Sequence, residues 1–141
     1  LSQQHRVTYD SPIEPELVIK DIANIKQQST QYGGARPFGV FLMIAGIREK
    51  KPELYTSDIT GNYFSYYANA IGENDEKVKE KLREKYKIEN NIKKNTKIAF
   101  DIFKDIQGKN FDLDRFELVY IRNDEGQLRR VVRGELNDFS K

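Results

Sequence analysis

Few residues in this 141-residue chain have the type and spacing that chemistry requires. There is one histidine, His5, and no cysteine, which excludes a disulfide framework and a thiolate metal site. No HExxH or similar ligand spacing surrounds His5, so we predict neither a metal site nor catalysis there. There is no G-x-S-x-G sequence, and the first residue is Leu1, whereas an amino-terminal nucleophile must be Thr, Ser or Cys. The sequence therefore predicts no catalytic residue, no metal site and no cofactor.

Three glycines, Gly33, Gly34 and Gly39, raise the alternative of a phosphate-binding loop. They precede an apolar stretch instead of opening a helix, and no Lys-Ser or Lys-Thr pair follows them. The end of a helix followed by the start of a strand is therefore the better interpretation. Arg36 lies between these glycines, next to Pro37, and we interpret it as a structural residue that holds backbone carbonyls or a carboxylate. A subunit contact is the alternative role for Arg36.

A second candidate site is the aromatic group Tyr63, Phe64, Tyr66 and Tyr67. Aromatic residues stack on bases in proteins that bind single-stranded nucleic acid, but this chain has 24 basic and 22 acidic residues and a net charge of only +2. We therefore expect these rings to pack in the core and across strands. Charges of alternating sign over residues 76–87 predict a solvated helix face with i to i+4 pairs.

The longest apolar stretch, Phe38 to Ile47, carries no charge. This composition predicts a strand that is covered on both faces. The stretch is about half as long as the roughly 20 residues that cross a bilayer, so we expect a soluble chain without a transmembrane helix. The covering layers must come from other elements of the chain or from a partner.

The remaining patterns place these residues on elements. A helix of about 15 residues is expected from Pro15, with Val18, Ile22 and Ile25 on its apolar face and Lys26 among the polar residues. In chain order we then expect the strand 38–47, a charged turn 48–52, a strand 53–57, a turn 58–61, a strand ending at Gly72, two helices within 73–107 of which the second is better buried, a strand within 115–123, an NDEG turn, a strand within 127–132 and the start of a helix at Glu135. Strands and helices in separate runs predict an α+β fold with antiparallel sheets, in a single domain over residues 1–141.

The segment KQQSTQYGGARPFGVFLMIAGI, followed by LYTSDITGNYFSYYANAIGEN, resembles the α-type subunits of archaeal proteasome core particles. The family pattern is close to TQYGGVRPFGVSLLIAG and then LYxTDPSGxYxxYKAxAIG, and QQHRVTYDSPI is similar to the family's AQNHRxTYGEPI. The chain departs from it at Ala35, at Tyr67, and at Ile59 and Thr60, where the usual Pro-Ser is replaced and a looser turn is expected. The residues taken as family-motif positions are Tyr32, Gly33, Gly34, Arg36, Pro37, Phe38, Gly39, Asp58, Gly61, Ala70, Ile71 and Gly72.

The resemblance implies the four-layer αββα sandwich of the amino-terminal nucleophile hydrolases. It also implies that the chain is a carboxyl-terminal part of such a subunit, without the gating tail, the first helix and the early strands. The family's α-type subunits are not peptidases. They form a heptameric ring that gates access to the proteolytic chamber and templates assembly of the catalytic β ring.

The partners implied by the resemblance are other α subunits, β subunits and regulatory ATPase or activator particles, with no nucleic acid and no membrane. The expected location is the cytoplasm, and also the nucleus if the source is eukaryotic. Two alternatives stay open. One is a fragment of a β-type threonine peptidase, which requires a threonine exposed upstream by processing. The other is a stand-alone binding module.

Overall fold

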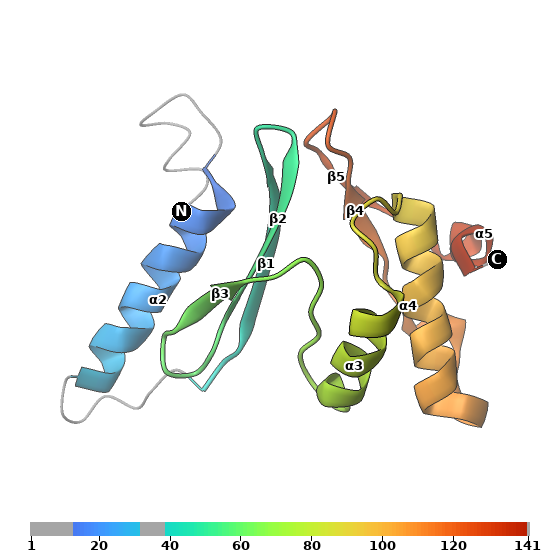
Figure 1. Cartoon of the computed structure of the whole chain (residues 1–141), viewed down its shortest axis with the longest axis horizontal. Coiled ribbons are helices and arrows are strands. Elements are labelled where there is room, and N and C mark those ends of the chain that lie inside the picture. Colours follow the sequence, from blue (N-terminus) through green and yellow to red (C-terminus); the bar gives the residue numbers. More distant parts are fainter. Residues whose placement is uncertain (1–12, 32–38, 141) are drawn as a thin grey trace. The chain divides into compact units, whose positions relative to one another are not determined.

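The computed structural model describes residues 13–31 and 39–140, and the chain forms two compact units, residues 1–67 and 68–141 (Figure 1). The helices are α2 (Pro15–Gln31), α3 (Asp75–Lys85), α4 (Ile92–Gln107) and α5 (Leu136–Ser140). The strands are β1 (Leu42–Arg48), β2 (Lys51–Ser57), β3 (Tyr63–Ser65), β4 (Val119–Ile121) and β5 (Leu128–Arg130). This order confirms the predicted sequence of elements. None of the described helices combines the length and the hydropathy needed to span a membrane.

Helix α2 packs against the sheet of the first unit. Pro15 occupies the first helical position, where its missing N–H costs nothing, and Glu16 lies in the first turn near the positive end of the helix. The predicted helix is confirmed, but its buried face is rotated by one residue from the predicted one. Ile19 and Ala23 are buried, whereas Ile25 is 50% exposed. The next inward position on this face is taken by Lys26, which is 2% exposed.

Strands β1 and β2 form the predicted hairpin, paired antiparallel from Leu42 opposite Ser57 to Arg48 opposite Lys51. The turn is shorter than expected. It consists of Glu49 and Lys50 alone, with φ values of 50° and 64°. Two residues with positive φ match the twist of a hairpin, but this turn contains no glycine, so the composition of residues 48–52 does not reveal its length.

Strand β3 completes the predicted meander by pairing antiparallel with β2, Ser57 opposite Tyr63 and Tyr55 opposite Ser65. It has only three residues and does not continue to Gly72 as expected. Its first residue packs as predicted, because the Tyr63 and Tyr55 rings meet edge to face with centroids 6.5 Å apart. The same packing prediction is wrong for Phe64, Tyr66 and Tyr67, which are 53%, 42% and 76% exposed.

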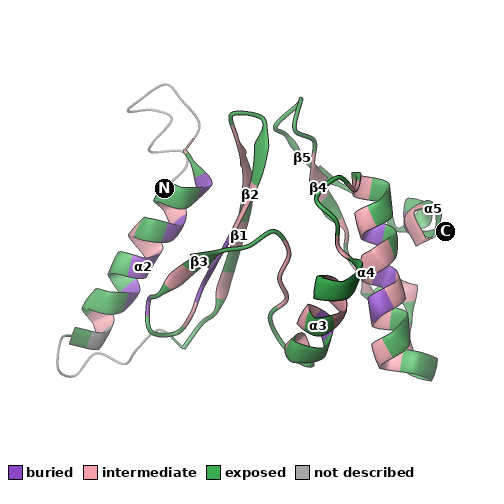
Figure 2. Ribbon diagram, viewed as in Figure 1, coloured by how far each residue is buried: buried purple, intermediate pink, exposed green. Residues whose placement is uncertain are grey.

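The strand predicted over Phe38–Ile47 differs from β1 in extent and in cover. Residues 39–41 precede the strand, and β1 lies at the edge of the three-stranded sheet. Gly46 faces the helix, since an added Cβ would lie 2.5 Å from Pro15 Cγ. On the opposite face, Met43 is 37% exposed and Phe64, aligned with it through the buried Thr56 of β2, is 53% exposed. Exposed residues occur along all three strands of the sheet (Figure 2). The prediction of cover on both faces is therefore wrong for the described chain.

The two helices predicted within residues 73–107 are confirmed as α3 and α4. The Asn91 side chain caps α4 by accepting a hydrogen bond from the Lys94 N–H at 2.9 Å. Helix α4 is the better buried of the two, with Thr96, Phe100 and Ile102 inside against Val78 alone on α3. The other residues of α3 are half-buried or exposed, as expected for the charged face.

The core of the second unit is built by Phe100, Val131 and Leu136, with Phe116 packed edge to face on Phe100 at a centroid distance of 5.6 Å. Strands β4 and β5 pair antiparallel beside it. Their turn is the predicted NDEG, and Gly126 takes a φ of 64°. Each of these strands has three residues, and the segment before β4 contains short 3₁₀ turns and packs Phe111 and Phe116 against the core.

Replacing Asn91 with alanine is expected to destabilise the second unit by about 1 kcal/mol, since the Lys94 N–H loses its acceptor. The measurement is the free energy of unfolding in urea, followed by far-ultraviolet circular dichroism. Asn91→Asp is the control, because aspartate also caps and should retain wild-type stability. Equal losses in both variants would contradict the capping role.

Candidate functional site

The turn Asp58–Asn62 contains two of the family-motif residues, Asp58 and Gly61. The Asp58 N–H donates to the Asn62 carbonyl at 3.0 Å, which closes the turn. The Asp58 carboxylate accepts from the Thr60 N–H at 2.9 Å, the Thr60 hydroxyl at 2.7 Å and the Asn62 N–H at 3.0 Å. The predicted turn is confirmed, but the looser geometry expected from Ile59 and Thr60 is not found. The Thr60 side chain adds a hydrogen bond instead.

Gly61 brings this turn against helix α2. Its φ is 88°, a conformation that favours glycine. An added Cβ would lie 2.9 Å from the Ala23 carbonyl oxygen and 2.7 Å from Gln27 Cγ. The position therefore needs glycine for two reasons, the backbone angle and the close approach of the helix.

Lys26 is the residue that sequence reasoning missed. It is 2% exposed, and its Nζ donates to the Val40 carbonyl at 2.7 Å, the Asp58 carbonyl at 2.9 Å and the Ser57 hydroxyl at 3.0 Å. The available signal was its spacing, because Ile19, Ala23 and Lys26 repeat at i, i+4 and i+7. A lysine at such a position is ordinarily expected at the solvent-exposed border of the apolar face. Here its ammonium is buried between α2 and the sheet.

Two opposing effects set the charges at this site. Burial lowers the pKa of the Lys26 ammonium, and the negative charge of Asp58 opposes that shift. Burial also raises the pKa of the Asp58 carboxyl, but hydrogen bonds from Thr60 and Asn62 outweigh it and hold the pKa below its ordinary value. The Lys26 ammonium can donate three hydrogen bonds, which matches the three oxygens that lie within 3.0 Å of its Nζ.

Asp58→Ala is expected to destabilise the first unit by roughly 1 to 3 kcal/mol, because the turn loses the acceptor of three hydrogen bonds. Because folding lowers the Asp58 pKa, this contribution is present above pH 3.8 and disappears as the pH falls through the folded-state pKa. Thermal unfolding from pH 7 to pH 3 measures both effects. Asp58→Asn, which keeps an oxygen acceptor without the charge, should lose less stability and show no such pH dependence. A wild-type advantage over Asp58→Ala that stays constant down to pH 3 would contradict this assignment.

The other motif residues do not join this turn. Gly39 is exposed, and Ala70, Ile71 and Gly72 belong to the second unit. The Ala70 N–H donates to the Asn69 side chain at 2.8 Å, and the Gly72 carbonyl accepts from the Asp75 N–H at 3.3 Å ahead of α3. The motif residues outside the described part of the chain are Tyr32, Gly33, Gly34, Arg36, Pro37 and Phe38.

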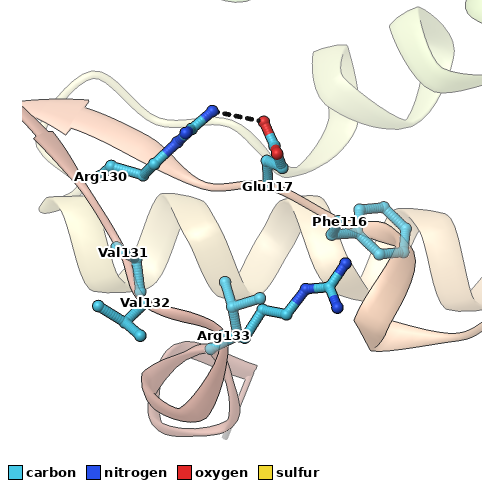
Figure 3. A pocket seen from close by; sticks show the side chains of 7 residues that line it. Phe116, Glu117, Arg130, Val131, Val132 and Arg133 are labelled. Carbon is cyan, nitrogen blue, oxygen red and sulfur yellow. Dashed lines mark hydrogen bonds and ion pairs between the residues drawn. The ribbon is translucent and has the colours of Figure 1, made fainter.

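The second unit has a pocket of about 400 Å³ at the carboxyl-terminal end of β5 (Figure 3). Phe116, Val131 and Leu136 are among the apolar residues that line it. Arg130 and Glu117 form an ion pair of 2.9 Å at its edge, with side chains 70% and 77% exposed. Neither a nucleophile nor a histidine lines this pocket, and the described residues contain no group of three or more His, Asp or Glu placed to hold a metal ion.

The described residues thus define an α+β protein whose motif turn binds its own backbone and side chains, which is a structural site. The chain belongs to the proteasome subunit family, since the family model described as "Proteasome subunit" matches residues 2–121. Its fold is accordingly of the amino-terminal nucleophile hydrolase type. The matched residues include the motif turn and every described element from α2 to β4.

Several similar proteins are named proteasome subunit alpha. The protein from Pyrobaculum aerophilum is 36% identical over 132 residues, which cover 94% of this chain and 54% of the relative. The protein from Pyrococcus horikoshii is 35% identical over 139 residues, covering 98% of this chain and 52% of the relative. A protein from Saccharolobus islandicus is 44% identical over 87 residues, or 62% of this chain and 36% of the relative. The chain spans about half the length of the first two relatives.

Proposed function

We propose that the protein is a non-catalytic α-type subunit of the proteasome core particle. The observation that carries this proposal is the similarity to proteins named proteasome subunit alpha over nearly the whole chain. The described site agrees with it, because Lys26, Asp58 and Gly61 bind and position the chain's own backbone. The α-type subunits of this family are the ones without peptidase activity.

In this role the protein forms an outer ring with further α subunits, controls substrate access to the chamber, and supports assembly of the proteolytic β ring. Its other partners are regulatory ATPase or activator particles, and its location is the cytoplasm. We further propose that both units belong to one proteasome-type domain, an interpretation supported by a family match that runs through both of them.

The exposed apolar face of the meander supports the domain proposal. Met43 on β1 and Phe64 on β3 lie on this face, away from α2, and β1 has no strand on its outer side among the described residues. Apolar side chains gathered on an exposed sheet face are typical of a surface that another element or partner covers. A second sheet stacked on it, as in the family sandwich, supplies that cover.

The test is assembly of the protein as its gene encodes it, expressed alone and together with the β subunit of the same organism. Native mass spectrometry and electron microscopy should show heptameric rings of the protein alone and stacked rings in the co-expression. Peptidase activity should appear only when the β subunit is present, and should vanish when the terminal threonine of that subunit is replaced.

Two outcomes would overturn the proposal. One is a protein that forms neither rings nor complexes with the β subunit. The other is peptidase activity of the protein alone, with a threonine at its processed terminus identified by mass spectrometry, since this is the property of a β-type subunit.

A further inference from the structure

The most unusual feature of the first unit is a buried ammonium group without a carboxylate partner. Lys26 is 2% exposed, and the described residues offer its Nζ no ion pair within salt-bridge distance. Burial of a charged group is costly unless hydrogen bonds replace its water. Four oxygens do so. Three lie within 3.0 Å of Nζ, the Val40 carbonyl at 2.7 Å, the Asp58 carbonyl at 2.9 Å and the Ser57 hydroxyl at 3.0 Å, and the Ser57 carbonyl lies at 3.5 Å. The site is therefore fully occupied by the protein itself.

Val40 and Ser57 stand at the two chain ends of one hairpin, and Asp58 follows in the next turn. Val40 lies two residues before β1, and Ser57 is the last residue of β2. In the register, Leu42 is opposite Ser57, so this is the open end of the hairpin. The other end is closed covalently by Glu49 and Lys50. At the open end, no turn joins the two segments, and Lys26 bridges them by donating hydrogen bonds to Val40 and to Ser57.

The Asp58 carbonyl extends the connection to the neighbouring turn. Asp58 binds the ammonium through its main chain and orders Thr60 and Asn62 through its carboxylate. One side chain of α2 thus contacts both the segment that leads into β1 and the turn that leads into β3.

We propose that Lys26 is a latch that keeps the open end of the β1–β2 hairpin and the Asp58–Asn62 turn closed together. When its ammonium leaves the three oxygens, the two segments open as one local event, ahead of unfolding of the unit. The latch goes beyond the proposed function, because it concerns local opening within one chain and not assembly. It also fixes the relative positions of two exposed apolar segments, Val40–Phe41 and Ile59.

Amide hydrogen exchange, followed by nuclear magnetic resonance on the full chain, tests the latch with Lys26→Met. Methionine keeps much of the length of lysine without the charge or the donors. Exchange at the amides of Asp58, Thr60 and Asn62 should become at least tenfold faster. The ladder amides in the middle of the hairpin and the central amides of α2 should keep their wild-type rates. Lys20→Met, at an exposed lysine of the same helix, is the matched control and should change none of these rates.

The pattern of exchange decides between a latch and a general contribution to stability. A uniform acceleration across the first unit, or no acceleration at the turn, would overturn the proposal. If Lys26→Met does not fold, Ser57→Ala provides the same test, because it removes one acceptor and leaves the ammonium in place. Its effect should be smaller and confined to the same amides, and a uniform effect there would equally exclude the latch.

Discussion

Gly61→Ala is expected to destabilise the first unit by about 3 kcal/mol or more. Holding a non-glycine residue at a φ of 88° contributes roughly 1 kcal/mol of this loss. The larger part comes from the added Cβ, which would lie 2.9 Å from the Ala23 carbonyl oxygen and force the turn away from α2. The measurement is the free energy of unfolding in urea, with the transition assigned to the first unit from its tyrosine resonances.

Gly126→Ala is the matched control for this substitution. Gly126 also has a positive φ, 64°, but no atom lies within 4 Å of the position that an added Cβ would take. The control variant should therefore lose only about 1 kcal/mol, from the second unit. Equal losses in the two variants would show that the backbone angle alone matters and that the contact between the turn and α2 does not.

Phe100→Ala is expected to destabilise the second unit by about 3 to 5 kcal/mol, which is the usual cost of a cavity at a buried phenylalanine. Phe100 is 4% exposed and contacts Val131, Leu136 and the Phe116 ring, so the cavity would lie between α4, α5 and the segment before β4. Such a loss is a large part of the stability of a unit of this size, and partial unfolding at 37 °C should follow.

Phe64→Ala provides the comparison, because Phe64 is 53% exposed on the face of the meander that points away from α2. In the isolated chain this variant should lose less than about 1 kcal/mol. In the protein as its gene encodes it, the loss should be larger if a second sheet covers that face, as proposed. Thermal unfolding of each variant, in this chain and in the protein as its gene encodes it, makes the comparison. A Phe64→Ala loss as large as that of Phe100→Ala in this chain would contradict the exposure of that face.

Local signals in the sequence predicted most of the elements. Pro15 marked the start of α2, the NDEG segment marked the turn between β4 and β5, and Asp58 with Gly61 marked the turn before β3. Each of these signals acts through the backbone of its own few residues, so it does not depend on the rest of the chain. Family membership was likewise readable from motif residues alone, and the family match confirms it.

Predictions that depended on what surrounds an element were less successful. The apolar composition of residues 38–47 predicted a strand covered on both faces. The structure shows that the described chain covers only one face of the sheet and leaves the other exposed. The same limit applies to Tyr66 and Tyr67, whose aromatic character suggests burial while the structure leaves them in solvent. An apolar composition shows that burial of a segment is favourable, but it does not show whether other residues of the chain are placed to bury it.

The sequence by itself determined the order of the elements, the α+β class and the family, because these follow from periodicity, turn residues and motif spacing along the chain. Only the tertiary structure decided which face of α2 is buried and that Lys26 lies inside it. The physical reason is that an ammonium can be buried only where oxygen acceptors converge. Those acceptors, on Val40, Ser57 and Asp58, are distant in sequence and meet Lys26 only when the meander folds against the helix.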